Sequence, residues 1–329
     1  MPLATSSTSA TPSRAAPAAP AAPAAPAARP VPAFEPSHTL RGTRILSLAL
    51  NLPGPAALLR CQRLGADCVK LEPPAPAPGH ASGDPMARYS QNAYAALHEG
   101  IRTLQADLKT GPGQAALHAE LDAADVLLTS FRPSALRKLG LEWHALQQRW
   151  PRLSMVRIVG GAGARSEEPG HDLTYQAEAG LLAGTGCALP ASLQADMAGA
   201  LAASEAVLQA LLARAVSGQG VCIDVALEDA AHWLALPRGW GLTTAGGDVG
   251  GAHAGYGVYP CADGRVAVAA LEPHFAARLF AAAGLDPATD PRAPETRGAV
   301  AAFLEGQTRS GLDALAALQD IPLHTLPPE

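Results

Sequence analysis

The chain has 329 residues, 16% of which are charged, and a formal net charge of −5. This length allows two domains or one large domain with a sizeable core, and the acidic balance argues against nucleic acid as a partner. The five cysteines form no C-x-x-C pair, which fits a reducing compartment and argues against a disulfide framework or a cysteine metal site.

Residues 1–36 are almost entirely Ala, Pro, Ser and Thr. Proline at this density prevents both helix and sheet, so we expect a disordered tail. The tail lacks the compact apolar core and cleavage site of a secretory signal. The most apolar later stretch, residues 197–216, contains Glu205 and Arg214 and indicates a core helix. We therefore expect a cytoplasmic protein that does not bind membranes.

The first folded segment predicts a strand, a helix and a second strand, at residues 44–49, 56–64 and 68–72. Such a unit indicates a parallel sheet with a right-handed crossover. Glu72 ends the second strand, where the acidic residue of a dinucleotide site would bind ribose. The turn between the first strand and the helix contains Pro53 and Pro55, which lack the N–H groups that bind a pyrophosphate. This turn argues against NAD.

The alternation of strands and helices continues, with elements expected at residues 102–108, 114–124, 126–129, 153–159 and 221–227. Phe131 and Arg132 follow a buried strand at its carboxyl end, where parallel sheets bind ligands. Arg132, Arg137 and Lys138 are therefore candidates for binding phosphates. The alternative is that they form the solvated basic start of a helix.

A smaller unit is predicted after a connecting segment at residues 233–254. Asp263-Gly264 separates two β-rich runs and indicates a hairpin. Glu272 opens a helix, and the remaining residues are expected to be helical. The predicted fold class is α/β, with a large parallel-sheet domain at residues 37–232 and a smaller α/β domain at residues 255–329.

The pair His171-Asp172 follows a glycine-rich loop at residues 160–163 and opens an apolar run at residues 175–182 that is expected to be a buried helix. Ionisable side chains at the start of a buried helix experience its positive end and reduced solvation, which shift pKa values. We therefore interpret the pair as a candidate catalytic site. The structural alternative is that Asp172 caps the helix and His171 only packs.

Several segments occur in an order typical of one enzyme family. They are residues 42–48, 53–55, 64–74, 107–109, 131–133, 138–141, 170–172, 175–177, 195–199, 223–225 and 272–273. In this order the chain resembles the family III CoA-transferases and their relatives, the α-methylacyl-CoA racemases. The resemblance implies a Rossmann-like large domain, a smaller α/β domain and an interlocked homodimer. It also implies acyl-CoA substrates, with coenzyme A entering as part of the substrate and with no metal or permanently bound cofactor.

The resemblance assigns different roles in the two reactions. In the transferases the aspartate that matches Asp172 attacks the thioester and forms an anhydride. In the racemases the residues that match His171 and Asp196 exchange the α-proton as two bases, and a glutamate that matches Glu272 holds the histidine. Contacts to coenzyme A are expected from Pro53, Glu72, Arg102, Phe131, Arg132 and Arg137.

The run at residues 270–275 is similar to the racemases, so we expect racemisation of 2-methylacyl-CoA thioesters, with CoA transfer to a free carboxylic acid as the alternative. Two other classes stay open, a nicotinamide oxidoreductase and a family member without activity. The intact His171, Asp172, Asp196 and Glu272 argue against the inactive member, whereas a changed loop and a short C-terminus favour it. In all, three departures from the family bear on CoA binding and on interlocking. Glu99 stands in the basic turn, the loop at residues 159–169 lacks its usual aromatic residue, and the chain ends before the segment that returns to the large domain.

Overall fold

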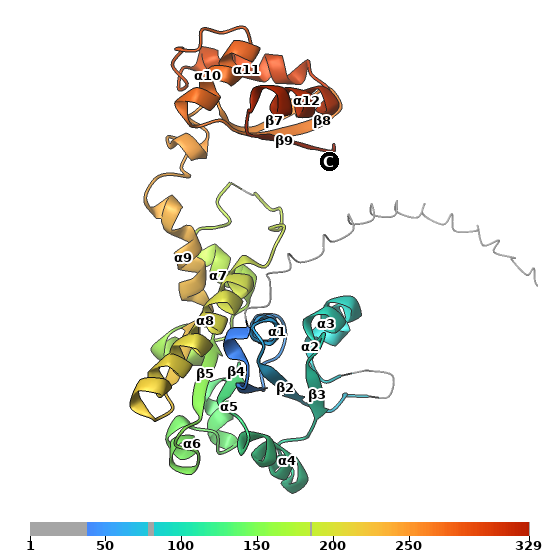
Figure 1. Ribbon diagram of the computed structural model, residues 1–329, viewed down its shortest axis with the longest axis vertical. Coiled ribbons are helices and arrows are strands. Elements are labelled where there is room, and N and C mark those ends of the chain that lie inside the picture. Colours follow the sequence, from blue (N-terminus) through green and yellow to red (C-terminus); the bar gives the residue numbers. More distant parts are fainter. Residues whose placement is uncertain (1–37, 78–81, 185, 329) are drawn as a thin grey trace, which may run out of the picture.

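The computed structural model describes residues 38–77, 82–184 and 186–328, so the expected tail lies outside the described residues. Two α/β units follow one another along the described chain. Figure 1 shows them at opposite ends of the long axis, with α9 (Leu227–Gly239) leading from the larger unit towards the smaller one. The predicted α/β fold class, with a large and a small unit, is confirmed.

A six-stranded sheet forms the centre of the larger unit, and all its pairings are parallel. The strands are β1 (Arg44–Ser47), β2 (Asp67–Glu72), β3 (Arg102–Gln105), β4 (Val126–Thr129), β5 (Ser154–Val159) and β6 (Cys222–Ala226). Their order is β3-β2-β1-β4-β5-β6, the doubly wound Rossmann order. The order reverses direction between β1 and β4, and ligands of such sheets bind at this point, beyond the carboxyl ends of the strands.

Helices cover both faces of this sheet, because successive strand residues point to opposite sides. Ile45 packs into the core under α1 (Pro53–Arg63), α8 (Gln194–Ser217) and α9. Leu46 packs into the core on the other face, under α4 (Gly111–Leu121), α5 (Pro133–Lys138) and α6 (Trp143–Arg149). The shorter elements are η1 (His38–Leu40), α2 (Pro85–Tyr89), α3 (Gln91–Leu97), η2 (Gly163–Glu167) and α7 (Asp172–Glu178).

The long helix α8 is apolar and long enough to cross a membrane by length and composition alone. In the fold it packs against α1, α9, β5 and β6 through a face of small residues. Gly199 belongs to this face, and a Cβ at its position would lie 2.2 Å from Cδ2 of Leu227. A larger residue here would displace the Leu227 side chain, so glycine allows the close approach of α8 and α9 that is typical of a packed core helix. Met197 and Leu201 on its other side are exposed.

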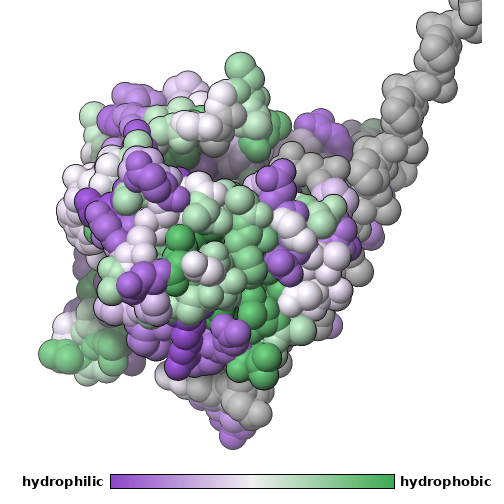
Figure 2. All heavy atoms as spheres, turned by 90° about the horizontal axis from the view of Figure 1, so that it is seen from above, coloured by the Kyte–Doolittle hydropathy of each residue, from purple (hydrophilic) through white to green (hydrophobic). Residues whose placement is uncertain are grey.

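The smaller unit contains an antiparallel sheet of β7 (Tyr256–Cys261), β8 (Gly264–Ala269) and β9 (Leu323–Leu326). The predicted hairpin is confirmed, with a turn at Ala262-Asp263. The helical expectation for the C-terminal residues was wrong at β9, which is too short to show a strand periodicity. The remaining elements are η3 (Asp248–Gly250), α10 (Pro273–Ala282), α11 (Pro294–Glu305) and α12 (Arg309–Gln319). From this end of the molecule, Figure 2 shows apolar surface bordered by polar residues.

Candidate functional site

A cavity of about 320 Å³, called here the central cavity, opens at the carboxyl ends of β1, β4 and β5. Both His171 and Asp196 line it. The other lining residues are Leu50, Asn51, Pro53, Ser130, Phe131, Arg132, Ile158, Val159, Gly160, Ser166, Glu168, Pro169, Gly170, Tyr175 and Leu227. A larger hollow of about 440 Å³ lies on the sheet of the smaller unit, but small apolar residues dominate its lining. The chemistry therefore belongs to the central cavity.

Asp172 is buried and does not line the central cavity. Its Oδ1 accepts a hydrogen bond from the backbone N–H of Asp196 at 3.0 Å, and its Oδ2 accepts one from Nε2 of Gln176 at 2.5 Å. The alternative that Asp172 caps its own helix and His171 only packs was wrong. His171 is the N-cap of α7, whereas Asp172 satisfies a free N–H in the first turn of α8.

Asp196 combines access to the cavity with a perturbed acidity. Burial, and then the negative charge of Asp172, raise the pKa of Asp196 from 3.8 to about 7. A carboxyl group with this pKa is present in both protonation states near neutral pH, so it can accept or return a proton. His171 is exposed at the rim of the same cavity. The imidazole of His171 and the carboxyl group of Asp196, with its raised pKa, therefore line the same cavity.

The glycine-rich loop between β5 and α7 closes tightly over Tyr175. A Cβ at Gly160 or at Gly170 would lie 2.4 Å from the Tyr175 hydroxyl, so a larger residue at either position would displace the Tyr175 ring. Glu228 fixes this loop by accepting the N–H of Ala162 at 2.7 Å. Arg165 reinforces the contact through ion pairs with Glu228 at 2.5 Å and with Glu178 at 2.8 Å. The loop is thereby held as one wall of the central cavity.

A second cavity of about 230 Å³, called here the edge cavity, lies at the carboxyl ends of β2 and β3. Phe131 lines both cavities, so they adjoin along the same edge of the sheet. The edge cavity is otherwise lined by Leu71, Glu72, Pro73, Ala106, Asp107, Leu108, Lys109 and Leu139. Together the two cavities form an elongated site, with Arg132 at the central cavity and Lys109 at the edge cavity.

The structure divides the residues expected to contact coenzyme A. Pro53, Phe131 and Arg132 line the central cavity, and the Arg132 side chain forms no hydrogen bond or ion pair with any described residue. Arg102 lines neither cavity and instead pairs with Glu120 at 2.8 Å. Arg137, which also lines neither cavity, pairs with Glu142 at 2.9 Å on the solvated side of α5. Arg132 is therefore the best placed of these cations.

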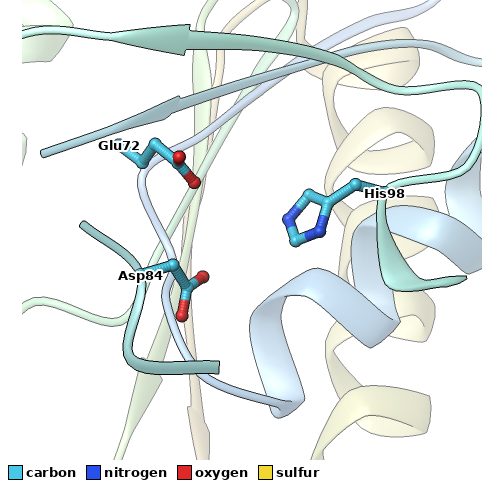
Figure 3. Close-up of side chains that lie close together, drawn as sticks. All are labelled: Glu72, Asp84 and His98. Carbon is cyan, nitrogen blue, oxygen red and sulfur yellow. The ribbon is translucent and has the colours of Figure 1, made fainter. Parts of the chain in front are cut away.

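Glu72 belongs to a buried cluster that also contains Asp84 and His98 (Figure 3), and ligand atoms of the three side chains lie within 4.8 Å of one another. The ammonium of Lys70 pairs with Asp84 and lies 3.3 Å from Glu72 and 2.8 Å from Nε2 of His98. Lys70 therefore takes the place that a cation would take. Nδ1–H of His98 donates to the carbonyl oxygen of Tyr94 at 2.6 Å, which leaves Nε2 as the acceptor for Lys70.

Glu272 lies apart from the other predicted catalytic residues. It is exposed at the N-cap of α10 in the smaller unit, and it does not line the central cavity. Within the described part of one chain, every residue that lines this cavity comes from the larger unit. One chain thus brings His171 and Asp196 together but does not bring Glu272 to them.

Sequence analysis missed two residues of the site. Gln176 lies one helical turn after Asp172, and this i,i+4 spacing was a usable signal for their hydrogen bond. Asn51 lines the central cavity with a left-handed backbone, at φ 64°. No local sequence pattern predicts the conformation of Asn51, because it depends on a contact with Asp84, 33 residues further along the chain.

Residues 40–326 match the family model for CoA-transferase family III. The alpha-methylacyl-CoA racemase of Mus musculus is 32% identical over 263 residues, which cover 75% of this chain and 65% of that protein. A probable fatty acyl-CoA transferase of Mycobacterium tuberculosis is 32% identical over 221 residues, covering 62% and 54%. The chain thus spans less than two thirds of the length of these curated relatives.

Solved structures agree with the sequence comparison. A CAIB/BAIF family protein from Brucella suis has a TM-score of 0.70 at 25% identity, over 87% of this chain and 83% of that one. The match of nearly the whole described chain to one family model, together with this likeness of fold, decides the assignment. The chain belongs to CoA-transferase family III.

Proposed function

We propose that this protein racemises 2-methylacyl-CoA thioesters by moving the α-proton between two bases, His171 and Asp196. One observation carries the proposal. His171 and Asp196 line the central cavity, whereas Asp172 is buried with both carboxylate oxygens hydrogen-bonded. A nucleophilic role for Asp172 requires an accessible oxygen, while two bases require only that their side chains reach the same carbon.

The proposed chemistry balances without a further reactant. One base takes the proton from C2, and the electron pair of the C–H bond moves to the thioester oxygen to give an enolate. The other base delivers its proton to the opposite face of C2, and the pair returns from oxygen to carbon. The α-proton of a thioester is weakly acidic, so the bases need a pKa near the working pH, as Asp196 has with its value of about 7.

The proposed substrate extends along the edge formed by the carboxyl ends of the strands. The acyl group occupies the central cavity, and coenzyme A continues past Phe131 towards the edge cavity. Arg132, with no ionic partner among the described residues, pairs with a phosphate, and Lys109 at the edge cavity is a second cation. Coenzyme A enters and leaves as part of the substrate, and the proposal includes no resident cofactor.

The proposal includes a homodimer in which a second copy completes the site. Glu272 is exposed on the smaller unit and lies outside the central cavity of its own chain. If it orients His171, as the resemblance to racemases implies, it must come from the smaller unit of another chain. A dimer that places each small unit against the other chain's central cavity meets this requirement.

CoA transfer through Asp172 is the second candidate. The isolation of Glu272 from the central cavity favours it, and the transferase relative is as similar in identity as the racemase relative. In this reaction a carboxylate oxygen of Asp172 attacks the thioester carbon, CoA leaves as a thiolate, and an acyl anhydride forms. Asp172 would first have to give up its hydrogen bond to Gln176 or to the Asp196 N–H.

The direct test uses a single epimer of a 2-methylacyl-CoA without any free acid. Racemisation converts it to an equal mixture of epimers, measured by chiral chromatography of the hydrolysed acids. An epimer that stays pure, while CoA moves to an added carboxylic acid, would establish transfer instead.

A further inference from the structure

Asn51 has a backbone conformation that the surrounding structure must enforce. Its φ is 64°, and among the described residues only Asp320, at 51°, is another non-glycine residue with positive φ. A side chain in this left-handed region is disfavoured, and such residues cluster at functional sites.

Buried polar groups fix the backbone around Asn51. Its N–H donates to Oδ1 of Asp84 at 3.0 Å, and the same oxygen accepts the N–H of Met86 at 2.9 Å. Asp84 is only 2% exposed, and its other oxygen pairs with Lys70. The preceding N–H, of Leu50, donates to Oγ of a serine after β4 at 3.1 Å. The buried Lys70 cluster therefore anchors the turn that lines the central cavity.

Asn51 lines the central cavity together with His171 and Asp196. Its Oδ1 is buried without a hydrogen-bond partner, and neither amide atom bonds to any described residue. A buried polar group without a partner is destabilising and rare in folded proteins, so an unpaired amide oxygen in a residue beside two candidate bases indicates a ligand contact. Rotation of the amide plane exchanges its acceptor and its two donors, so the group can present N–H groups to a ligand.

We propose that the Asn51 amide donates a hydrogen bond to the carbonyl oxygen of the bound thioester. The inference rests on the proposed function in that the ligand is taken to be an acyl-CoA. Either candidate reaction moves an electron pair onto this oxygen, giving an enolate in racemisation and a tetrahedral oxyanion in transfer. A fixed donor at the cavity wall stabilises that charge in both cases. The strained turn then orients the Asn51 amide towards the thioester carbonyl oxygen.

Replacement of Asn51 by glycine separates the effect of the side-chain amide from the effect of the backbone conformation. Asn51→Gly adopts φ 64° without strain and keeps the backbone hydrogen bonds, so only the amide is lost. Asn51→Asp keeps the shape of the side chain and removes its N–H donors. Asp320→Gly is the matched control, because it relieves the same backbone strain in the smaller unit, away from the central cavity.

Two unreactive ligands measure the contact independently of turnover. In one, a methylene group replaces the thioester sulfur and the carbonyl remains; the other is a thioether that lacks the carbonyl. The wild type should bind the ketone more tightly. In Asn51→Gly and Asn51→Asp this preference should fall about fivefold, the worth of one hydrogen bond. The kcat for α-proton exchange should fall about a hundredfold, and the Tm of Asn51→Gly should not fall.

If Asn51→Gly prefers the ketone over the thioether as strongly as the wild type does, the inference is overturned, whether or not turnover changes. The amide would then not contact the carbonyl. Full exchange activity in Asn51→Asp would overturn the role as a donor. Asp320→Gly should retain both the preference and the kcat. A wild type without exchange or transfer would refute the proposed function, and the ligand preference would still decide the role of Asn51.

Discussion

The backbone N–H of Asp196 donates a hydrogen bond to Oδ1 of Asp172 over 3.0 Å and ties the first turn of α8 to the first turn of α7. One aspartate is thereby buried as a structural acceptor, and the other is held beside it with its side chain at the central cavity. Burial, and then the charge of the neighbouring Asp172, raise the pKa of Asp196 and favour its protonated form.

The stability of the protein should depend on the protonation of Asp196. Its folded-state pKa of about 7 lies above the usual 3.8, so the folded state binds this proton more tightly than the unfolded state. The resulting stability is complete below pH 3.8 and is lost as the pH rises through about 7. The Tm of Asp196→Asn relative to wild type should therefore increase between about pH 5 and pH 8. Asp229→Asn, at an exposed site on α9, should show no such trend, and a Tm difference independent of pH would contradict the account.

Asp172→Asn separates the two candidate reactions at nearly constant shape. The amide oxygen of the variant can still accept the N–H of Asp196, so α8 keeps its cap. If Asp172 only supports the site, α-proton exchange should persist within about tenfold of wild type, as for a lost positioning contact. If Asp172 is the nucleophile, acyl transfer should fall by several orders of magnitude. The measurement is the rate of each reaction in the folded variant, with circular dichroism as the check on folding.

Lys70→Met should destabilise the protein by about 3–5 kcal/mol, the cost of breaking a buried ion pair. It would leave the buried carboxylates of Glu72 and Asp84 without their shared cation. Denaturant unfolding measures the effect, and Asp84→Asn combined with it should restore part of the loss by removing one charge. Lys138→Met, at an exposed position, should leave the free energy of unfolding nearly unchanged. Equal stabilities of the two lysine variants would contradict the role given to Lys70.

Arg132→Ala should weaken the binding of coenzyme A about tenfold at low salt, because a charge-assisted hydrogen bond to phosphate would be lost. The difference from wild type should shrink as ionic strength rises. Arg137→Ala is the matched control, since this exposed arginine already pairs with Glu142 and lines neither cavity. Calorimetric titration of both variants provides the test. An equal loss in both would place the phosphates along α5 instead.

The sequence predicted most of the fold because its strands are short apolar runs bounded by glycine and proline. The Asp263-Gly264 pair also located the hairpin of the smaller unit. The sequence did not predict β9, because this strand exists through its pairing with β8. It also placed residues 233–239 in a connection, whereas α9 continues through Pro237 to Gly239. A proline usually ends a helix, but here it falls in the last turn, where little of the helix remains to be disrupted.

The sequence indicated candidate residues for the site, whereas their orientation depends on the fold. His171 and Asp196 were expected to face one cavity, and the structure places them so. The burial of Asp172 depends on the packing of α7 against α8, which no local pattern encodes. The place of Asn51 in the site could not be predicted for the same reason, since its conformation depends on a contact with the distant residue Asp84. Glu272 lies outside the central cavity of its own chain, a placement that no local pattern in the sequence encodes.

The central claim is that His171 and Asp196 exchange an α-proton, and incubation of a 2-methylacyl-CoA in deuterated water tests it most directly. The account predicts deuterium at C2 in the wild type without any acid acceptor, detected by mass spectrometry, and no new thioester when an acceptor is added. With single epimers, His171→Ala should still exchange only the epimer that faces Asp196, and Asp196→Asn only the other, since each variant keeps one base. Each missing exchange should be slowed a hundredfold or more, the usual effect of removing a general base. A new thioester with the acceptor acid, and no deuterium at C2, would contradict the account.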